Sequence, residues 1–331
     1  MNLRNIRQKK EIISLVARYG IFVVFGLLVV LFSLSNERFF TIENLFLILQ
    51  QASPLGIAVV GMVFVLIVVG IDISVGRSMF FISTIIGFLI TTTHVIPESL
   101  FSGMSGFLLV YAIAIILGVL IGGVNGLFVT KFKMLPFIVT LATGSILRGV
   151  GLKISGSASI SVSVLGGVSN GRLGSIPIVL IIFVLTAVLF DYVLRQTVYG
   201  RHLMAIGNSF QNAERAGIHV QRNIIAAYMI CGCLGAIGGI LSAGQIGSVA
   251  AGFGEGNEFI VISAAVLGGT SLFGGKGNIL PGAIVGILLI STIMNGLAMV
   301  NASPYVYTIV RGVIIFLAVA LDSIESTREL R

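Results

Sequence analysis

The sequence has few of the residues on which water-soluble enzymes depend. Only 10% of its 331 residues are charged, it contains no tryptophan, and it has two cysteines and three histidines. A soluble domain of this length carries about 25% charged residues. Hydrophobic residues make up 56% of the chain, and the mean hydropathy is +1.11. The composition therefore excludes a soluble globular protein and predicts a polytopic membrane protein in a lipid bilayer.

Motifs for nucleotide binding, metal binding and catalysis are missing from the sequence as well. The glycine-rich stretch 274–277 lacks the spacing of a phosphate-binding loop and the hydroxyl residue that follows its lysine. His94, His202 and His219 are scattered and give no metal-ligand spacing. No Ser-His-Asp or paired-carboxylate arrangement stands out, and the two cysteines fall inside an apolar run, which is typical of core packing. We expect no catalytic residue, no metal, no cofactor and no enzymatic activity in this chain.

Basic residues outnumber acidic ones, 20 against 12, which gives a formal net charge of +8. Such an excess could indicate nucleic-acid binding, but the basic cytoplasmic loops that orient a membrane protein explain it better. We therefore expect no nucleic-acid partner. The basic segment 1–18 precedes an apolar run without a small-residue cleavage site, so it is predicted to remain as a cytoplasmic amino-terminal segment.

Ten apolar runs alternate with polar or glycine-rich breaks. They cover 19–35, 54–70, 78–92, 106–130, 135–152, 176–194, 223–244, 259–273, 280–300 and 305–321. A full helical crossing needs about 20 residues, so 78–92 and 259–273 are short. The predicted fold is an all-α polytopic membrane protein with about eight to ten transmembrane or re-entrant helices. A transmembrane domain would occupy 19–322, followed by a cytoplasmic tail at 323–331.

The basic residues predict the orientation of these spans. With ten crossings and the amino end inside, one side holds the amino-terminal cluster and Arg77, Lys131, Lys133, Arg195, Arg201, Arg215, Arg222, Lys276, Arg328 and Arg331. The other side holds only Arg38, Lys153 and Arg172. This asymmetry follows the positive-inside rule and places both termini in the cytoplasm.

A short series of residues occurs twice in the same order. Asn-Gly-Leu at 125–127, Pro-Phe-Ile-Val-Thr at 136–140 and Arg-Gly at 148–149 form the first copy. Asn-Gly-Leu at 295–297, Pro-Tyr-Val-Tyr-Thr at 304–308 and Arg-Gly at 311–312 form the second. On the predicted spans the two copies enter the membrane from opposite sides. This indicates an inverted internal repeat, in which a substrate path forms where the two halves meet.

The longest polar stretch, 195–222, is predicted to lie in the cytoplasm. Asn208 could cap a short helix over 210–216 that ends at Gly217. Such a loop either docks on a partner or is an ordinary connector, and its residues alone leave both readings open.

Four segments, taken in order, resemble a known family. The stretches 69–76, 136–149, 199–217 and 264–275 look like those of the membrane permeases in ribose/xylose/allose-type ABC sugar importers, a group that includes the autoinducer-2 importer. The likeness runs from about 54 to 321. It departs from the family in two places: Val69 replaces a glycine in Gly-Gly-Ile-Asp-Leu-Ser, with Ile73 in place of leucine, and Gly207-Asn208-Ser209 replaces Gly-Gly-Asn.

The resemblance implies a subunit that forms the path for a monosaccharide in the bacterial inner membrane. Its implied partners are an ABC ATPase subunit, a second permease copy or paralogue, and a periplasmic or lipid-anchored sugar-binding protein. The loop 195–222 would be the coupling loop to the ATPase, with Gly200, Arg201, Gly207, Asn208, Phe210, Ala213, Glu214, Arg215 and Gly217 as its contact set. The alternatives are a permease for nucleosides or branched-chain amino acids, or a secondary carrier in which an intramembrane charge couples ions.

Candidate residues of the substrate path are polar or aromatic residues in or beside the apolar runs: Asp72, Ser74, Asn125, Phe137, Arg148, Asn295, Tyr305 and Arg311. Each has a structural alternative. Asp72 could instead accept backbone N–H bonds or pair with Arg77, the arginines could reach an interface, the asparagines could link helices, and the aromatic rings could simply pack. Glu255 and Glu258, on a predicted outer loop, could contact the binding protein or be merely solvated.

Overall fold

The computed structural model describes residue 23 and residues 25–329. Within these residues seven helices are long and apolar enough to cross a membrane. They are α2 (Ile42–Ile67), α3 with its π-helical continuation η1 (Val75–Thr92), α4 (Met104–Thr130), α5 (Pro136–Ser155), α7 (Ile178–Gln196), α10 (Val220–Ile246), and η4 with α12 (Ile279–Met299). Three apolar helices are shorter: Phe25–Ser35, α11 (Asn257–Leu267) and the apolar part of α13, Pro304–Ala320. The predicted all-α polytopic fold is confirmed.

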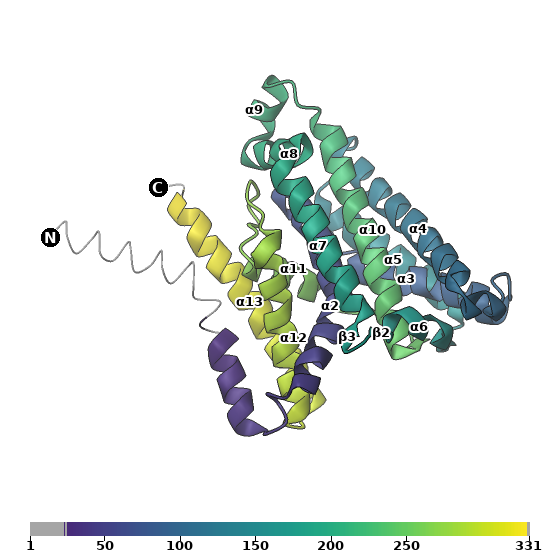
Figure 1. The fold of residues 1–331 in the computed structure, drawn as a ribbon. Helices are drawn as coiled ribbons and strands as arrows, with labels where there is room; N and C mark the ends of the chain where they lie inside the picture. The colour runs from purple at the N-terminus through teal and green to yellow at the C-terminus, as the bar shows by residue number, and fades with distance from the viewer. Residues whose placement is uncertain (1–22, 24, 330–331) are drawn as a thin grey trace.

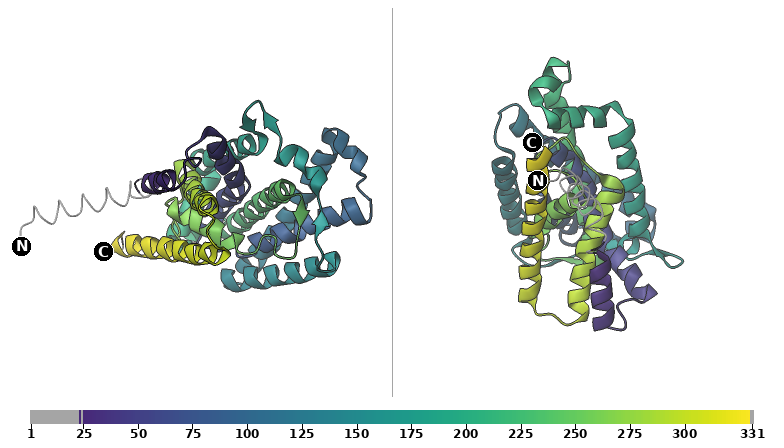
Figure 2. Two further views of the ribbon diagram at one scale, coloured as in Figure 1. Left: turned by 90° about the horizontal axis from the view of Figure 1, so that it is seen from below. Right: turned by 90° about the vertical axis from the view of Figure 1, so that its left-hand side faces the viewer.

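Short elements connect these helices (Figure 1). They are η2 (Glu98–Ser102), η3 (Ser163–Leu165), α6 (Gly166–Ser169), α8 (Val198–Asn208) and α9 (Phe210–Arg215). Strands β1 (Ile160–Ser161) and β4 (Ser248–Val249) form one antiparallel pair, and β2 (Arg172–Leu173) and β3 (Ile176–Pro177) form another. The last helix, α13, continues to Glu329 and lies at the periphery of the bundle in both views of Figure 2. The segment 1–18 lies outside the described residues.

Helix α2 begins twelve residues before the predicted start of its span at 54, because Pro54 lies inside the helix rather than at its beginning. Proline has no N–H to donate to the carbonyl four residues earlier. That carbonyl belongs to Gln50, and it accepts a 2.8 Å hydrogen bond from Gln245 of α10 instead. A side chain from the neighbouring helix therefore satisfies the group that proline leaves free, and α2 continues through the polar residues around Gln51.

Helices α4 and α10 approach each other through glycine. A Cβ atom at Gly118 would lie 2.3 Å from the carbonyl oxygen of Gly232, and one at Gly122 would lie 2.1 Å from that of Tyr228. Small residues allow such close backbone contact between helices in a membrane. The high glycine content of the apolar runs therefore has a packing role at this interface.

Helices α3 and α11 begin inside the bundle, which explains why their apolar runs looked short. Arg77, near the start of α3, packs against Gly144, eight residues into the 20-residue helix α5. Gly76 lies in backbone contact with Gly254, and a Cβ at Gly76 would also lie 2.3 Å from Oε2 of Glu258 in the first turn of α11. The amino-terminal ends of α3 and α11 thus meet near mid-height of the molecule.

The helix pairing agrees with the inverted repeat. Helix α4 ends beside the start of α10, since Gly126 packs on Ile225. Helix α12, in contrast, begins at this end, where its first residues bind the last turn of α7. The two repeat-related helices therefore run in opposite directions. Helix α3 packs on α10 and α5, while α11 packs on α2 and α13. If α2–α5 form the first half and α10–α13 the second, each short helix lies between a long helix of the other half and the last helix of its own half.

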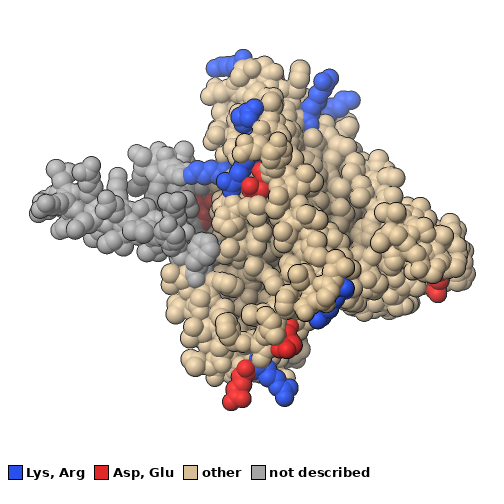
Figure 3. All heavy atoms as spheres, viewed as in Figure 1, with Lys and Arg blue, Asp and Glu red and all other residues tan. Residues whose placement is uncertain are grey.

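The end of the molecule that carries α8 and α9 is basic. Figure 3 shows several Lys and Arg side chains gathered there. The carboxyl-terminal part of α13 reaches the same end, because the backbone N–H of Leu272 donates to Oδ2 of Asp322 over 2.8 Å. The carboxyl-terminal helix and the loop 195–222 share one side, as the span count predicts.

Candidate translocation path and coupling region

The turn between α2 and α3 is built around a buried carboxylate. Oδ1 of Asp72 accepts hydrogen bonds from the backbone N–H of Ser74 at 2.9 Å and from its hydroxyl at 2.5 Å. Nδ2 of Asn125 on α4 donates to the same hydroxyl oxygen at 2.9 Å. The side chain of Asp72 does not pair with Arg77, which donates to the hydroxyl of Ser145 on α5. Asp72, Ser74 and Asn125 therefore form one buried group that fixes the start of α3.

Two further elements hold this turn, and the sequence did not single out their residues. The backbone N–H of Ile73 donates to Oγ1 of Thr140 on α5 over 3.1 Å. The hydroxyl of Tyr228 on α10 lies against Gly70: a Cβ atom on Gly70 would be only 2.8 Å from the hydroxyl oxygen. Thr140 belongs to the repeated Pro-x-x-x-Thr pattern, and this repeat could have identified it as a candidate. Nothing in the sequence around Tyr228 indicates its role.

Asn295 lies in a separate contact, on the other half of the repeat. It forms a reciprocal pair with Asn44 of α2, in which each Nδ2 donates to the other residue's Oδ1 over 3.0 Å. Both side chains are buried. The two repeat-related asparagines, Asn125 and Asn295, thus both link helices, the alternative role considered for them.

The two repeat-related arginines converge on the loop between β4 and α11. Nη2 of Arg148 lies 3.2 Å from Oε2 of Glu255, and the guanidinium also sits 5.9 Å from the ring centre of Phe80. Nη1 of Arg311 lies 2.6 Å from the position that a Cβ of Gly256 would occupy. Arg148, Arg311 and Glu255, distant in sequence, therefore meet around one loop.

Glu255 and Glu258 have different surroundings. The side chain of Glu255 is 68% exposed, whereas Glu258 is only 4% exposed and packs against the start of α3. Phe137 and Tyr305 are both exposed, at the first turns of α5 and α13, which begin at opposite ends of the bundle. The structure does not bring these two rings together.

The polar stretch 195–222 folds into two short helices. The hydroxyl of Ser209, not Asn208 as predicted, caps α9 by accepting from the backbone N–H of Asn212 over 3.3 Å. Asn208 is still helical, as the last residue of α8, while Ser209 is extended, with φ −166° and ψ 111°, and can reach over the first turn. Gly217 follows α9 at φ +79°, close to its predicted position.

The predicted coupling residues divide into an inward and an outward set. Inward residues make backbone or core contacts: Gly200, Gly207, Asn208 and Ala213. A Cβ at Gly200 would lie 1.9 Å from the carbonyl oxygen of Leu194. Outward residues are exposed: Arg201, Phe210, Glu214, Arg215 and Gly217. Asn208 is exposed as well, although its side chain lies against Gly275, so Asn208 and the outward set are available to a docking partner in this conformation.

Tyr199 anchors α8 to the bundle. Its ring stacks on Phe64 of α2 with centres 6.2 Å apart, and its hydroxyl donates to the carbonyl of Asn223 on α10 over 3.3 Å. Burial raises the pKa of Tyr199, so the phenol stays protonated and keeps donating at physiological pH. Helix α8 is thus attached to both α2 and α10.

Residues 44–319 match the family described as "Branched-chain amino acid transport system / permease component". The chain belongs to this family. It is 34% identical over 302 residues to the ribose import permease protein RbsC of Escherichia coli (strain K12), which covers 89% of this chain and 90% of the relative. It is 32% identical over 313 residues to the D-allose transport system permease protein AlsC of the same strain, covering 93% of this chain and 92% of AlsC. No solved structure matches the chain.

A third relative is the galactose/methyl galactoside import permease protein MglC of Escherichia coli (strain K12), which is 31% identical over 336 residues and spans 97% of this chain and 98% of MglC. The resemblance inferred from the four motifs is confirmed. The chain is a multi-pass membrane permease, a transport subunit rather than a catalytic enzyme.

Proposed function

We propose that this chain is the transmembrane subunit of an ATP-driven importer and forms the path for a monosaccharide across a bacterial inner membrane. Support for a sugar comes from relatives named for ribose, allose and galactose. The family description also mentions branched-chain amino acids, but these three relatives are all named for sugars, which favours a sugar over that alternative.

The observation that carries the path is the Arg148–Glu255 ion pair. Arg148 lies seven residues before the end of α5, about 10 Å along the helix axis. Its side chain is 26% exposed and that of Glu255 is 68% exposed. Charged groups at such depth do not face lipid tails, because the hydrocarbon offers them no hydrogen bonds. This face of the molecule therefore borders water or another subunit.

The same face carries small and hydroxylated residues. Ser145 and Gly149 on α5 and Thr308 and Gly312 on α13 are exposed, and no atom lies within 4 Å of a Cβ at either glycine. Serine and threonine hydroxyls, guanidinium groups and carboxylates offer the donors and acceptors that sugar hydroxyls need. We place the path along this α5–α13 face, with a second permease copy or paralogue covering its open side.

The other candidate residues receive distinct roles in this proposal. Arg148, Arg311 and Glu255 line the path, whereas Asp72, Ser74, Asn125 and Asn295 position the helices around it. Phe137 and Tyr305 lie toward its two ends. The outward set on α8 and α9 docks on a cytoplasmic ABC ATPase, and the opposite end receives the sugar-binding protein. Glu258 is buried against the start of α3, so it is not available to the sugar-binding protein in this conformation.

Transport in proteoliposomes tests this function. The chain would be reconstituted alone, and together with the ATPase and binding protein that purify with it. We expect uptake of labelled ribose, allose or galactose only with ATP and all components, and no uptake of leucine or uridine. Sugar accumulation by the chain alone under a proton gradient, or leucine uptake by the complex, would contradict the proposal.

A variant pair tests the path. Arg148→Gln should lower sugar uptake about tenfold or more, because it removes a charged hydrogen-bonding group. The matched control is Lys153→Gln, an exposed lysine near the end of the same helix, which should leave uptake unchanged. Equal uptake by both variants would remove Arg148 from the path.

A further inference from the structure

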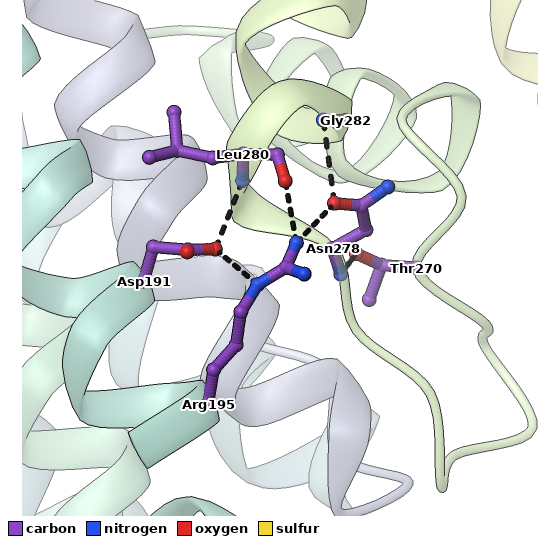
Figure 4. Close-up of polar contacts among 6 residues, drawn as sticks. All are labelled: Asp191, Arg195, Thr270, Asn278, Leu280 and Gly282. Carbon is purple, nitrogen blue, oxygen red and sulfur yellow. Dashed lines mark hydrogen bonds and ion pairs between the residues drawn. The ribbon is translucent and has the colours of Figure 1, made fainter.

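An extended residue at the start of α12 is held from two sides by α7. Leu280 has φ −110° and ψ 120° within η4 (Ile279–Ala283), so the backbone is not helical there. Its N–H donates to Oδ1 of Asp191 over 3.1 Å, and its carbonyl accepts from Nη2 of Arg195 over 2.5 Å. Figure 4 shows Asp191 and Arg195 reaching from α7 to both groups of this residue.

Asp191 and Arg195 act as one unit, which we term the clasp. They are four residues apart on α7, and their ion pair measures 2.9 Å between Nε of Arg195 and Oδ1 of Asp191. Residues with this spacing share one face of a helix. Nη2 of Arg195 also donates to Oδ1 of Asn278 over 3.1 Å. The clasp therefore holds the start of α12 and the residue at which the preceding loop ends (Figure 4).

That loop, residues 268–278, touches α8 and the end of α2 on its other side. The N–H of Gly275 donates to the carbonyl of Ile67, at the end of α2, over 2.9 Å. A Cβ at Gly207 of α8 would lie 1.9 Å from the same carbonyl oxygen and 2.2 Å from the nitrogen of Gly275. The ends of α8 and α2 are thus in backbone contact with the loop, and no flexible side chain separates them.

The loop also contacts α13. The backbone N–H of Leu272 donates to Oδ2 of Asp322 over 2.8 Å. The segment 268–278 therefore bonds to or touches the ends of α8, α2 and α7 and reaches α12 and α13. These elements thus meet at the loop through backbone contacts and charge-assisted hydrogen bonds.

We propose that residues 268–278 are a relay loop, and that Asp191 and Arg195 are positioning residues that couple ATP hydrolysis to movement of the path. A displacement of α8 enters at Gly207, and the relay loop carries it to α12 and α13. The clasp keeps the start of α12 in register with α7 while this happens. The inference rests on the proposed function, since it requires a partner that moves α8 and α9.

The test compares hydrolysis with transport in the reconstituted complex. Arg195→Gln and Asp191→Asn should still bind the ATPase, because the outward set on α8 and α9 is unchanged. We expect ATP hydrolysis to continue while the number of sugar molecules moved per ATP falls about tenfold, the size typical of a lost coupling between sites. Arg195→Lys keeps a cation that can reach the carbonyl of Leu280, and should recover part of the ratio.

The control is Arg172→Gln, an exposed arginine on β2 at the opposite end, which should keep the wild-type ratio. If hydrolysis and transport fell by the same factor in the clasp variants, the number of sugar molecules moved per ATP would be unchanged. That result would show a merely structural role and overturn the relay, and so would wild-type rates of both. If the wild-type complex moved no sugar, the proposed function would fail, and the relay with it. The wild-type arm thus separates the two failures.

Discussion

At the scale of single residues, Asp72 shows how a carboxyl group is kept inside an apolar bundle. Its carboxylate accepts both the N–H and the hydroxyl of Ser74, and the hydroxyl receives a further bond from Asn125. Buried charged groups persist only when hydrogen bonds replace those that water would make. The group therefore stabilises the turn that begins α3.

We expect Asp72→Ala to destabilise the protein by about 2 kcal/mol, because it leaves two buried donors of Ser74 without their acceptor. Asp72→Asn keeps an oxygen in that position and should be affected less. Melting temperatures of the purified variants in detergent would check this order. Equal stability of wild type and Asp72→Ala would mean that these hydrogen bonds do not support the turn.

Single residues were predictable where one position was anomalous in its own surroundings. Asp72, Arg148 and Arg311 stand out because charges are rare in apolar runs. The partners of these residues were not predictable. Asn295 bonds to Asn44 from 251 positions away, and the contrast between Glu255 and Glu258 depends on how the start of α3 packs against them. Such contacts are set by tertiary packing, which leaves no local signal.

At the scale of elements, glycine spacing decides how closely α4 and α10 pack. Gly122→Ala should destabilise the protein by about 2 kcal/mol, because the new Cβ would lie 2.1 Å from the carbonyl oxygen of Tyr228. Its neighbour provides the control. A Cβ at Gly123 meets only the side chain of Met229, at 3.6 Å, so Gly123→Ala should melt near the wild-type temperature. A similar loss in both variants would contradict close α4–α10 packing.

Each of the ten apolar runs overlaps a helix, so the existence of the helices was readable from hydrophobicity alone. The boundaries were less so. The start of α2 was misplaced because Pro54 and its polar neighbours looked like a break, and only the bond from Gln245 explains their place in the helix. The helix α8 was not predicted, because its few apolar residues pack against the bundle rather than forming a long apolar run.

At the scale of the whole molecule, the basic end with α8 and α9 should face the cytoplasm, since positive residues are retained on that side. Cysteine labelling with a membrane-impermeant maleimide tests this. Gln211→Cys lies on exposed α9, and Ser175→Cys lies in the exposed turn between β2 and β3, beside the start of α7 at the opposite end. Cys231 is buried and Cys233 is partly buried, so the wild type should give a low background.

In intact spheroplasts we expect Ser175→Cys to be labelled, and Gln211→Cys to be labelled only after the membrane is permeabilised. The reverse pattern would put α8 and α9 outside the cell, where they could not dock on a cytoplasmic ATPase as proposed. Because α4 ends and α12 begins at the end that carries α8 and α9, the result also fixes the direction in which each of these two helices crosses the membrane. One pair of exposed positions thus decides whether the α5–α13 face and the relay loop can serve an importer driven from the cytoplasm.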